Sequence, residues 1–464
     1  MPPPSALAIG LTICAATVFG CNDTAVVVRV ESDRGPSELD AICLQLDAAG
    51  SSRFGRRYQL ATRPLPQTLT ALAGGRTSFQ AIVYGLKNGI EVARTRRQLA
   101  FKDGAVELVS LPLDTCVPAP SSGTFRLAGN VPGAIDRALL EPAASGGLAL
   151  ALGAGQALRD AASATGLTAL QAGTPAAPAG AVAQLLAVDL DGDCLQDAVL
   201  LPAGAPPVLW MRAADGTFSE LAGALAISTP QRGVAAGDVD GDGTTDLVLV
   251  GGGEVHVLLN DGAGHFHELG GAFDTAPTDA TQVALGDLDG DGHLDAVVAQ
   301  GSAMPDVTRV YLNDAKGSGH FALAVAALPP LKERATALAL ADVDLDGDLD
   351  LIVAHAGAPV RLYLNRGNAF LEDRSFGGLP DQLAGDVQTL LAVDLNADCL
   401  PDLVVPRAGA APLVWLNAGQ GTFVAGPALD GGAALGAVAD DVTDDGLPDL
   451  LLFSATGLQL EVQQ

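Results

Sequence analysis

The sequence predicts an all-β protein, a seven-bladed β-propeller with ion-binding inner hairpin loops, preceded by a small β-sandwich. Apolar residues make up 48% of the 464-residue chain, aromatic residues only 4%, and there are 56 glycines, so we expect a core of small aliphatic side chains and many tight turns. The apolar runs are short, β-branched and interrupted by glycine, which excludes helical repeats. An acidic segment recurs at intervals of 47 to 55 residues, and this period is typical of propeller blades.

The first element is a signal peptide, predicted over residues 1–21. Residues 5–20 form an uncharged run that is too short to span a bilayer but fits the apolar region of a signal peptide. The run ends in Val18-Phe19-Gly20-Cys21, which resembles a bacterial lipobox with Cys21 as the lipidated residue, although no Lys or Arg precedes it. We expect an exported lipoprotein of the cell envelope, in the outer membrane or facing the periplasm. An ordinary signal peptide without lipidation is the alternative.

Residues 22–116 form the predicted β-sandwich, and residues 117–122, rich in proline and serine, form a linker. The β-rich runs alternate with turns, and Asn88-Gly89 supplies a hairpin signal between two of them. The expected strands are 25–31, 41–47, 79–86, 90–93 and 106–113.

Four cysteines remain besides Cys14 and Cys21, and export makes disulfides possible. Cys43 with Cys116 is our first choice, because Cys43 lies in a strand and Cys116 follows the last strand of the module. The others, Cys194 and Cys399, lie in loops about three blade steps apart, and Cys116 with Cys399 is the alternative pairing.

Residues 123–464 form the predicted propeller. Each acidic segment is followed by an apolar run, a glycine-containing turn and a second apolar run, and five repeats end in a version of Leu-Asn-x-Gly-x-Gly-x-Phe, as in 259–266. Six acidic segments mark six blades. A degenerate earlier blade, with its inner hairpin at 137–140 and 148–152, raises the expected count to seven. The strand after Phe125 is expected to complete the last blade and close the ring.

The acidic segments follow the pattern D-x-D-x-D-G-x-x-D, and we number them Asp turns 1 to 6 in chain order. Oxygens at positions 1, 3 and 5, the backbone carbonyl at position 7 and the carboxylate at position 9 can surround one Ca²⁺. Four carboxylates about 5 Å apart repel one another by roughly 1 kcal/mol per pair in water and about 3 at an effective dielectric of 20, which favours a counter-ion over a solvated acidic turn. We expect three to six bound Ca²⁺ ions.

The candidate metal ligands fall into a complete and a weaker set. The complete turns 2, 3 and 4 comprise Asp238, Asp240, Asp242, Thr244 and Asp246; Asp287, Asp289, Asp291, His293 and Asp295; and Asp342, Asp344, Asp346, Asp348 and Asp350. The weaker turns 1, 5 and 6 lose the glycine, one charge or both, and comprise Asp189, Asp191, Asp193 and Asp197; Asp394, Asn396, Asp398 and Asp402; and Asp441, Thr443, Asp445 and Asp449.

These turns, joined to the Leu-Asn-x-Gly-x-Gly-x-Phe signature at this period, resemble the FG-GAP/VCBS repeat family, whose propellers include the head of integrin α-subunits. The resemblance covers residues 123–464 and implies Ca²⁺ in the inner hairpin loops. It does not carry an activity over, because this fold hosts adhesins, lectin-like binders and appendages of enzymes alike.

The net charge of −29 limits the partners. Such a surface repels nucleic acids and anionic lipids, so we expect no nucleic-acid partner and contact with a membrane only through a lipid at Cys21. The expected function is non-catalytic binding of a protein or glycan at the cell envelope. The alternatives are a polysaccharide hydrolase or lyase with its site in the central channel, which paired acids or a His with a Tyr or Arg there would favour, and a purely structural envelope component.

Overall fold

The structure, a computed structural model, describes most of residues 181–463 and the strand backbones between residues 25 and 172. In the N-terminal part, side chains are described at Val30, Ile42, Ala81, Val83 and Leu99. Within the C-terminal part, the described residues exclude 194, 214–216, 302–305, 315–317, 381–385, 397, 399, 430–431, 441–447 and 455–456, and the side chains at 306, 440, 457–458 and 462–463.

Several sequence predictions therefore lie outside the described residues. They concern the signal peptide with Cys21, the linker 117–122, the side chains of Cys43, Cys116, Cys194 and Cys399, and Asp441, Thr443 and Asp445 of Asp turn 6.

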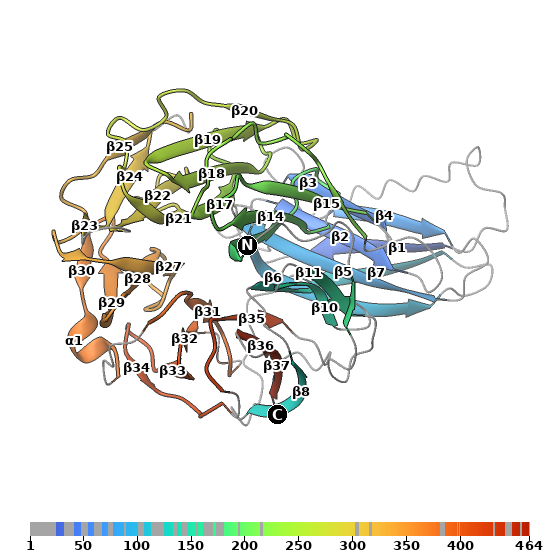
Figure 1. The fold of residues 1–464 in the computed structure, drawn as a ribbon. Coiled ribbons are helices and arrows are strands. Elements are labelled where there is room, and N and C mark those ends of the chain that lie inside the picture. Colours follow the sequence, from blue (N-terminus) through green and yellow to red (C-terminus); the bar gives the residue numbers. More distant parts are fainter. Residues whose placement is uncertain are drawn as a thin grey trace, which may run out of the picture.

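Six four-stranded antiparallel sheets form the repeat, and we number them blades 1 to 6 (Figure 1). Blades 1 to 3 contain β13 (Val182–Val188), β14 (Asp197–Pro202), β15 (Val208–Arg212) and β16 (Phe218–Glu220); β17 (Gly233–Gly237), β18 (Asp246–Gly251), β19 (Glu254–Asn260) and β20 (Phe266–Glu268); and β21 (Ala280–Gly286), β22 (Asp295–Gln300), β24 (Arg309–Asn313) and β25 (Phe321–Leu323).

Blades 4 to 6 continue around the ring. They contain β27 (Ala335–Ala341), β28 (Asp350–His355), β29 (Ala358–Asn365) and β30 (Leu371–Asp373); β31 (Leu391–Val393), β32 (Asp402–Arg407), β33 (Ala410–Asn417) and β34 (Phe423–Ala425); and β35 (Gly436–Asp440), β36 (Asp449–Ser454), β37 (Gly457–Gln463) and β8 (Phe125–Pro132). A short ribbon of β23 (Asp306–Val307) and β26 (Lys332–Glu333) lies between blades 3 and 4, and α1 (Ser375–Gly378) follows β30.

The ring closes through β8, as the sequence predicted. This strand pairs antiparallel with β37, with Pro132 opposite Gly457 and Phe125 opposite Gln463. Blade 6 therefore takes three strands from the end of the chain and its outer strand from residues more than three hundred positions earlier.

The predicted count of seven repeat blades is wrong, because the structure has six. The strands that we counted as a seventh, β9 (Arg137–Glu141), β10 (Gly147–Gly153), β11 (Gln156–Asp160) and β12 (Leu170–Ala172), form a sheet whose β9 contacts β13 and β35. The segment between β9 and β10, residues 142–146, holds no carboxylate. This sheet therefore lacks the buried aspartate that ties the strands of the repeat blades together.

The predicted β-sandwich is not shown either. Residues 25–112 form a three-stranded sheet of β4 (Gln67–Leu72), β1 (Ala25–Glu31) and β7 (Val106–Pro112), and a four-stranded sheet of β3 (Phe54–Gln59), β2 (Ala41–Asp47), β5 (Ser78–Lys87) and β6 (Ile90–Ala100). A sandwich requires a core shared by both inner faces. The five side chains described there are buried, but they do not define such a core.

Packing between neighbouring blades explains the composition of the strands. Every residue of β14, β18, β22, β28 and β36 is buried, because a middle strand meets a blade on each side, and its apolar residues are therefore consecutive. Innermost strands are crowded instead: a Cβ on Gly233 would lie 2.8 Å from the Cα of Gln282 in blade 3. Trp210 and Trp415 are 1% and 4% exposed and pack within these clusters.

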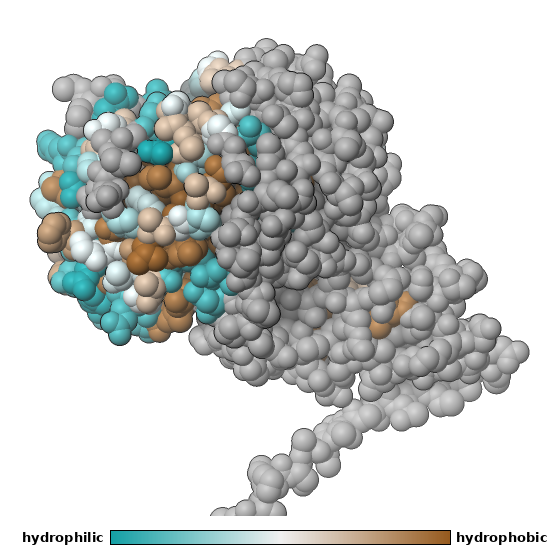
Figure 2. Space-filling view, turned by 90° about the horizontal axis from the view of Figure 1, so that it is seen from below, coloured by the Kyte–Doolittle hydropathy of each residue, from teal (hydrophilic) through white to brown (hydrophobic). Residues whose placement is uncertain are grey.

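The surface of the described blades has mixed polarity. Seen from below, apolar residues lie in the middle of the described face and hydrophilic residues near its edges (Figure 2). Some large apolar side chains are well exposed, among them Phe376 at 99% and Val325 at 83%. No helix in the described part of the chain has the length and apolar character needed to cross a membrane.

Candidate metal centres in the inner hairpins

Each Asp turn links the innermost strand of a blade to the second strand, and its own carboxylates fold it. In Asp turn 2, Asp238 accepts hydrogen bonds from the N–H groups of Gly241 and Gly243, at 2.8 and 2.9 Å. Asp240 accepts from the N–H of Asp242, whose own carboxylate accepts from the N–H of Thr244 at 2.8 Å. The pattern D-x-D-x-D-G therefore dictates a tight turn in which alternate carboxylates lie on its inner side.

Four of the turns assemble acidic groups that could hold an ion. Within each group, one carboxylate oxygen per residue lies within 4.8 Å of the others. The groups are Asp189, Asp191 and Asp197; Asp238, Asp240 and Asp246; Asp287, Asp289 and Asp291; and Asp342, Asp344 and Asp350. Turns 2, 3 and 4 were the complete set in the sequence, and the weaker turn 1 joins them.

Other predicted ligands are not part of these groups. The carboxylates at position 5 of turns 1, 2 and 4 and at position 9 of turn 3 are absent from them; these are Asp193, Asp242, Asp346 and Asp295. The position 7 residues, which we expected to offer a backbone carbonyl, close the turn through their N–H groups: Thr244, His293 and Asp348 donate to the position 5 carboxylate at 2.8, 2.9 and 3.1 Å.

Position 9 is the structural centre of each blade. Asp246 is fully buried, and its two oxygens accept from the N–H of Val239 at 2.9 Å and the N–H of Asn260 at 2.8 Å. One carboxylate thus joins the turn to the third strand. Asp197, Asp295, Asp350 and Asp402 make the same pair of bonds in their blades.

Burial makes these carboxylates hard to ionise without a counter-charge. It raises the pKa of Asp197 to about 8, the pKa values of Asp246, Asp295 and Asp350 to about 7, and that of Asp402 to about 6. Their backbone hydrogen bonds oppose the shift and the neighbouring aspartates add to it. A cation at the turn would supply the missing charge.

The remaining turns differ from this pattern. In turn 5, the amide of Asn396 donates to Asp398 at 2.9 Å, so an internal hydrogen bond replaces part of the repulsion that a cation would relieve. In turn 6, Asp449 is fully buried like its counterparts.

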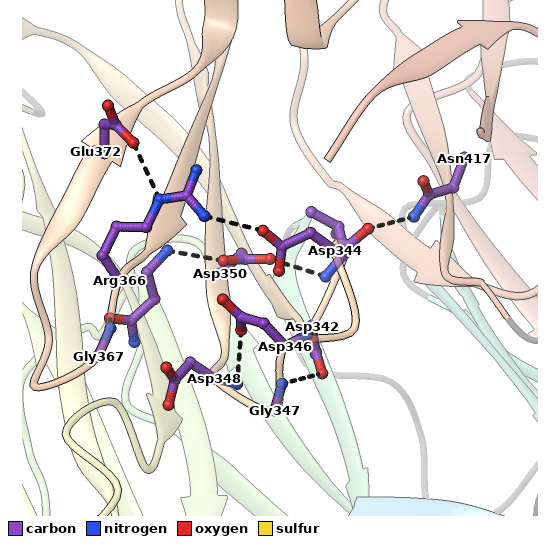
Figure 3. Close-up of polar contacts among 12 residues, drawn as sticks. Asp342, Asp344, Asp346, Gly347, Asp348, Asp350, Arg366, Gly367, Glu372 and Asn417 are labelled. Carbon is purple, nitrogen blue, oxygen red and sulfur yellow. Dashed lines mark hydrogen bonds and ion pairs between the residues drawn. The ribbon is translucent and has the colours of Figure 1, made fainter. Parts of the chain in front are cut away.

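A cationic side chain, Arg366, contacts Asp turn 4, and the sequence analysis missed it. Arg366 lies between Glu372 and Asp344, with Nε 3.0 Å from Glu372 and Nη1 3.1 Å from Asp344 Oδ2 (Figure 3). Asp344 is 10% exposed, and its other oxygen, Oδ1, is buried with no hydrogen-bond partner among the described residues. The all-oxygen donor set and this unpartnered oxygen fit a hard divalent cation such as Ca²⁺.

The signature asparagines join neighbouring blades, a role that the sequence did not reveal. The side-chain amide of Asn417 donates at 2.8 Å to the carbonyl of Val343 in turn 4 of the preceding blade (Figure 3). It also donates at 3.2 Å to the carbonyl of Pro401 in its own turn. Asn260, Asn313 and Asn365 repeat the arrangement. Each asparagine is the last residue of the third strand in its blade, so the signature marks the boundary between blades.

The six sheets and their acidic inner turns define the class of the protein, a repeat β-propeller with an aspartate cluster at the inner hairpin. Three FG-GAP-like repeats match the sequence, at residues 189–249, 238–298 and 342–405. These matched repeats support an FG-GAP repeat β-propeller family for this part of the chain. A search of curated proteins found no match.

Solved structures of similar fold are remote in sequence. A lectin of Agrocybe aegerita that recognises non-reducing terminal N-acetylglucosamine is 18% identical, with a TM-score of 0.43, over 65% of this chain and 83% of the lectin. The Pan2 WD40 domain of Neurospora crassa is 11% identical, with a TM-score of 0.45, over 75% of this chain and 99% of that domain. BBS1N in complex with ARL6DN is 12% identical, with a TM-score of 0.41, over 72% and 98%.

Proposed function

We propose that this protein is an exported, lipid-anchored, Ca²⁺-binding propeller that binds a protein or glycan at the cell envelope without catalysing a reaction. The observation that carries the proposal is the set of four acidic groups, each with oxygens from three aspartates within 4.8 Å. Cations in these turns would fix the inner hairpins and leave the rest of each blade free to present a binding surface. Such a rigid scaffold suits recognition.

The absence of a catalytic constellation at the axis supports the non-catalytic reading. The described residues that line the axial cavities include no carboxylate, histidine or tyrosine. His355, Glu333 and Arg361 do cluster in blade 4, but Glu333 is bound by Arg361 at 2.7 Å and by His355 at 3.4 Å. Burial also lowers the pKa of His355. This cluster is an ion-paired structural element, and none of its members lines an axial cavity.

The test is a glycan and protein-ligand array probed with protein lacking residues 1–21, in Ca²⁺ and after removal of metal with EDTA. Binding that requires Ca²⁺ is the expected result. Turnover of a polysaccharide, measured as released reducing ends or unsaturated products, would contradict the non-catalytic proposal and favour a hydrolase or lyase. Complete lack of ligands together with normal folding would favour a structural envelope component.

The anchor has its own test. Expression of the full chain with a labelled fatty acid should yield a labelled protein in the membrane fraction, and Cys21→Ala should abolish the label. Unlabelled, fully processed wild-type protein would indicate an ordinary signal peptide.

A further inference from the structure

Two cavities adjoin on the propeller axis, and we call them together the axial pocket. Their volumes are about 270 and 210 Å³, and both are lined by Gln282 and Gln388. Apart from Gly301, which follows β22, and Phe453 of β36, the other lining residues come from the innermost strands or the residues just before them. The pocket is therefore a product of the ring and of no single blade. The larger cavity is lined by Ala183, Arg232, Thr281, Gln282, Gly301, Arg334 and their neighbours.

The charge of the axial pocket is opposite to that of the chain. In a protein of net charge −29, the larger cavity is lined by Arg232 and Arg334 and, among the described residues, by no carboxylate. Both arginines lie directly before an innermost strand, β17 or β27, whereas the Asp turns directly follow these strands. The basic side chains and the acidic turns therefore lie at opposite ends of the inner strands.

The two arginines differ in how the fold holds them. The backbone N–H of Arg232 donates to Val250 at 2.8 Å, and the structure gives no ion-pair partner for its exposed guanidinium among the described residues. Arg334 Nε donates to the carbonyl of Gly301 at 3.2 Å, which fixes this side chain at the junction of blades 3 and 4. Guanidinium groups in such positions recognise planar anions such as carboxylates.

Neutral polar groups complete the lining. Gln184 exchanges two hydrogen bonds with the backbone of Val234, at 2.9 and 3.0 Å, and Gln388 donates to Asp386 at 2.7 Å, so these glutamines support the wall. The side-chain amide of Gln282 has no hydrogen-bond partner among the described residues, and it can both donate and accept. Such a group suits the hydroxyls of a sugar.

We propose that the axial pocket binds one carboxylate-bearing sugar residue of an acidic glycan. Arg232 and Arg334 hold the carboxylate, and Gln282 binds ring hydroxyls. The larger cavity, which all three residues line, has about 270 Å³ and is smaller than the roughly 300–1,000 Å³ of pockets for drug-sized ligands. It therefore accepts a single sugar residue and not an extended chain. This inference rests on the proposed binding function and names its site and ligand class.

The test is an NMR titration of the full Ca²⁺-loaded protein with D-glucuronate, D-glucose and inorganic phosphate. We expect saturable binding of glucuronate, and little or no binding of the other two. Arg232→Gln and Arg334→Gln should each weaken glucuronate binding about tenfold or more, because each removes a hydrogen bond to a charged group. Arg374→Gln, an exposed arginine of blade 4 outside the pocket, is the charge-matched control. Melting curves check that all variants fold.

Three outcomes overturn the inference. They are no glucuronate binding, binding that Arg232→Gln and Arg334→Gln leave unchanged, and phosphate binding as tight as that of glucuronate. If the array nevertheless finds a neutral glycan or a protein ligand, the proposed binding function stands and only this site and ligand class fail. If neither experiment finds a ligand, the proposed function itself fails.

Discussion

The side chain of Asn260 in blade 2 donates a hydrogen bond of 2.8 Å to the backbone carbonyl of Leu190 in Asp turn 1, a residue 70 positions earlier. The N–H of the same leucine donates to Asp197 of its own turn. In Asp turns 1 to 4, the residue at position 2 is thus fixed on one side by the turn's buried aspartate and on the other by the next blade. A change in the conformation of such a turn therefore also affects the contact with the next blade.

Asn260→Ala should lower the free energy of unfolding by roughly 2–4 kcal/mol. It removes the hydrogen bonds that the amide donates to the carbonyls of Leu190 and Thr245, and those that its oxygen accepts from the N–H groups of Gly262 and Gly264. Chemical denaturation in Ca²⁺ measures the change. Ser219→Ala, a polar truncation on the exposed outer strand of blade 1, is the control and should change stability little. A loss below 1 kcal/mol for Asn260→Ala would show that the blade boundary does not depend on this bond.

Metal removal should lower the melting temperature by many degrees. A ligand that binds only the folded state stabilises by roughly 2.7 kcal/mol per site at 100-fold saturation, and the mutual repulsion of the aspartates returns when the ion leaves. Ca²⁺ should restore the melting temperature better than Mg²⁺, which demands a tighter octahedron and gives up its water reluctantly. Asp240→Ala, Asp289→Ala and Asp344→Ala should each remove part of the effect, whereas exposed Glu220→Ala should not. Superimposed melting curves for stripped and Ca²⁺-loaded protein would mean that the turns hold no ion.

Arg366→Gln should raise the Ca²⁺ affinity of turn 4 about tenfold, because the guanidinium pairs with Asp344 at 3.1 Å and repels a second cation bound by the same carboxylate. Isothermal titration in an Asp240→Ala, Asp289→Ala background reduces the contribution of turns 2 and 3. Arg374→Gln changes the net charge equally without touching an Asp turn. Equal Ca²⁺ affinities of the Arg366→Gln and Arg374→Gln variants would show that Arg366 does not weaken Ca²⁺ binding at turn 4.

Position 4 of the Asp turns requires a left-handed backbone, with φ of 77°, 76° and 79° at Gly192, Gly241 and Gly290. Turn 4 has Leu345 there, at φ 58°. Leu345→Gly should raise the free energy of unfolding by about 1 kcal/mol, as relief of left-handed strain exceeds the added entropy of the unfolded chain. Gly241→Ala should lower it by about 1–2 kcal/mol. Gly432→Ala, with equally open space but no positive φ, is the control. A stability unchanged by both turn variants would contradict the argument.

Metal-free protein should become less stable as pH rises from 5 to 8. The raised pKa values of Asp197, Asp246, Asp295 and Asp350 mean that the folded chain binds more protons than the unfolded chain between about pH 4 and 8. The free energy of unfolding falls with pH in that window. Ca²⁺ competes with these protons, so saturating Ca²⁺ should remove or reverse the trend. A metal-free melting temperature that rises from pH 5 to 8 would contradict it.

Much of the candidate site was readable from the sequence, because D-x-D-x-D-G-x-x-D specifies local turn chemistry. The closing strand was also predictable, since Gly123-Thr124-Phe125 repeats a blade signature without a blade before it. Arg366 was missed because its proximity to Asp344 depends on how two turns of one blade meet in space. The asparagine bonds were missed because they cross a blade boundary. The count of seven failed because apolar alternation marks strands but does not show whether their sheet is a further blade of the repeat.

The pairing of β8 with β37 sets the order in which this protein can be made. On the ribosome, β8 emerges long before its partner, because β37 is synthesised more than three hundred residues later. Closure must wait until β37 has been made, so until then the edge of β8 is open to pairing with other chains. Folding of the ring is therefore late and dominated by contacts distant in sequence, which makes it slow.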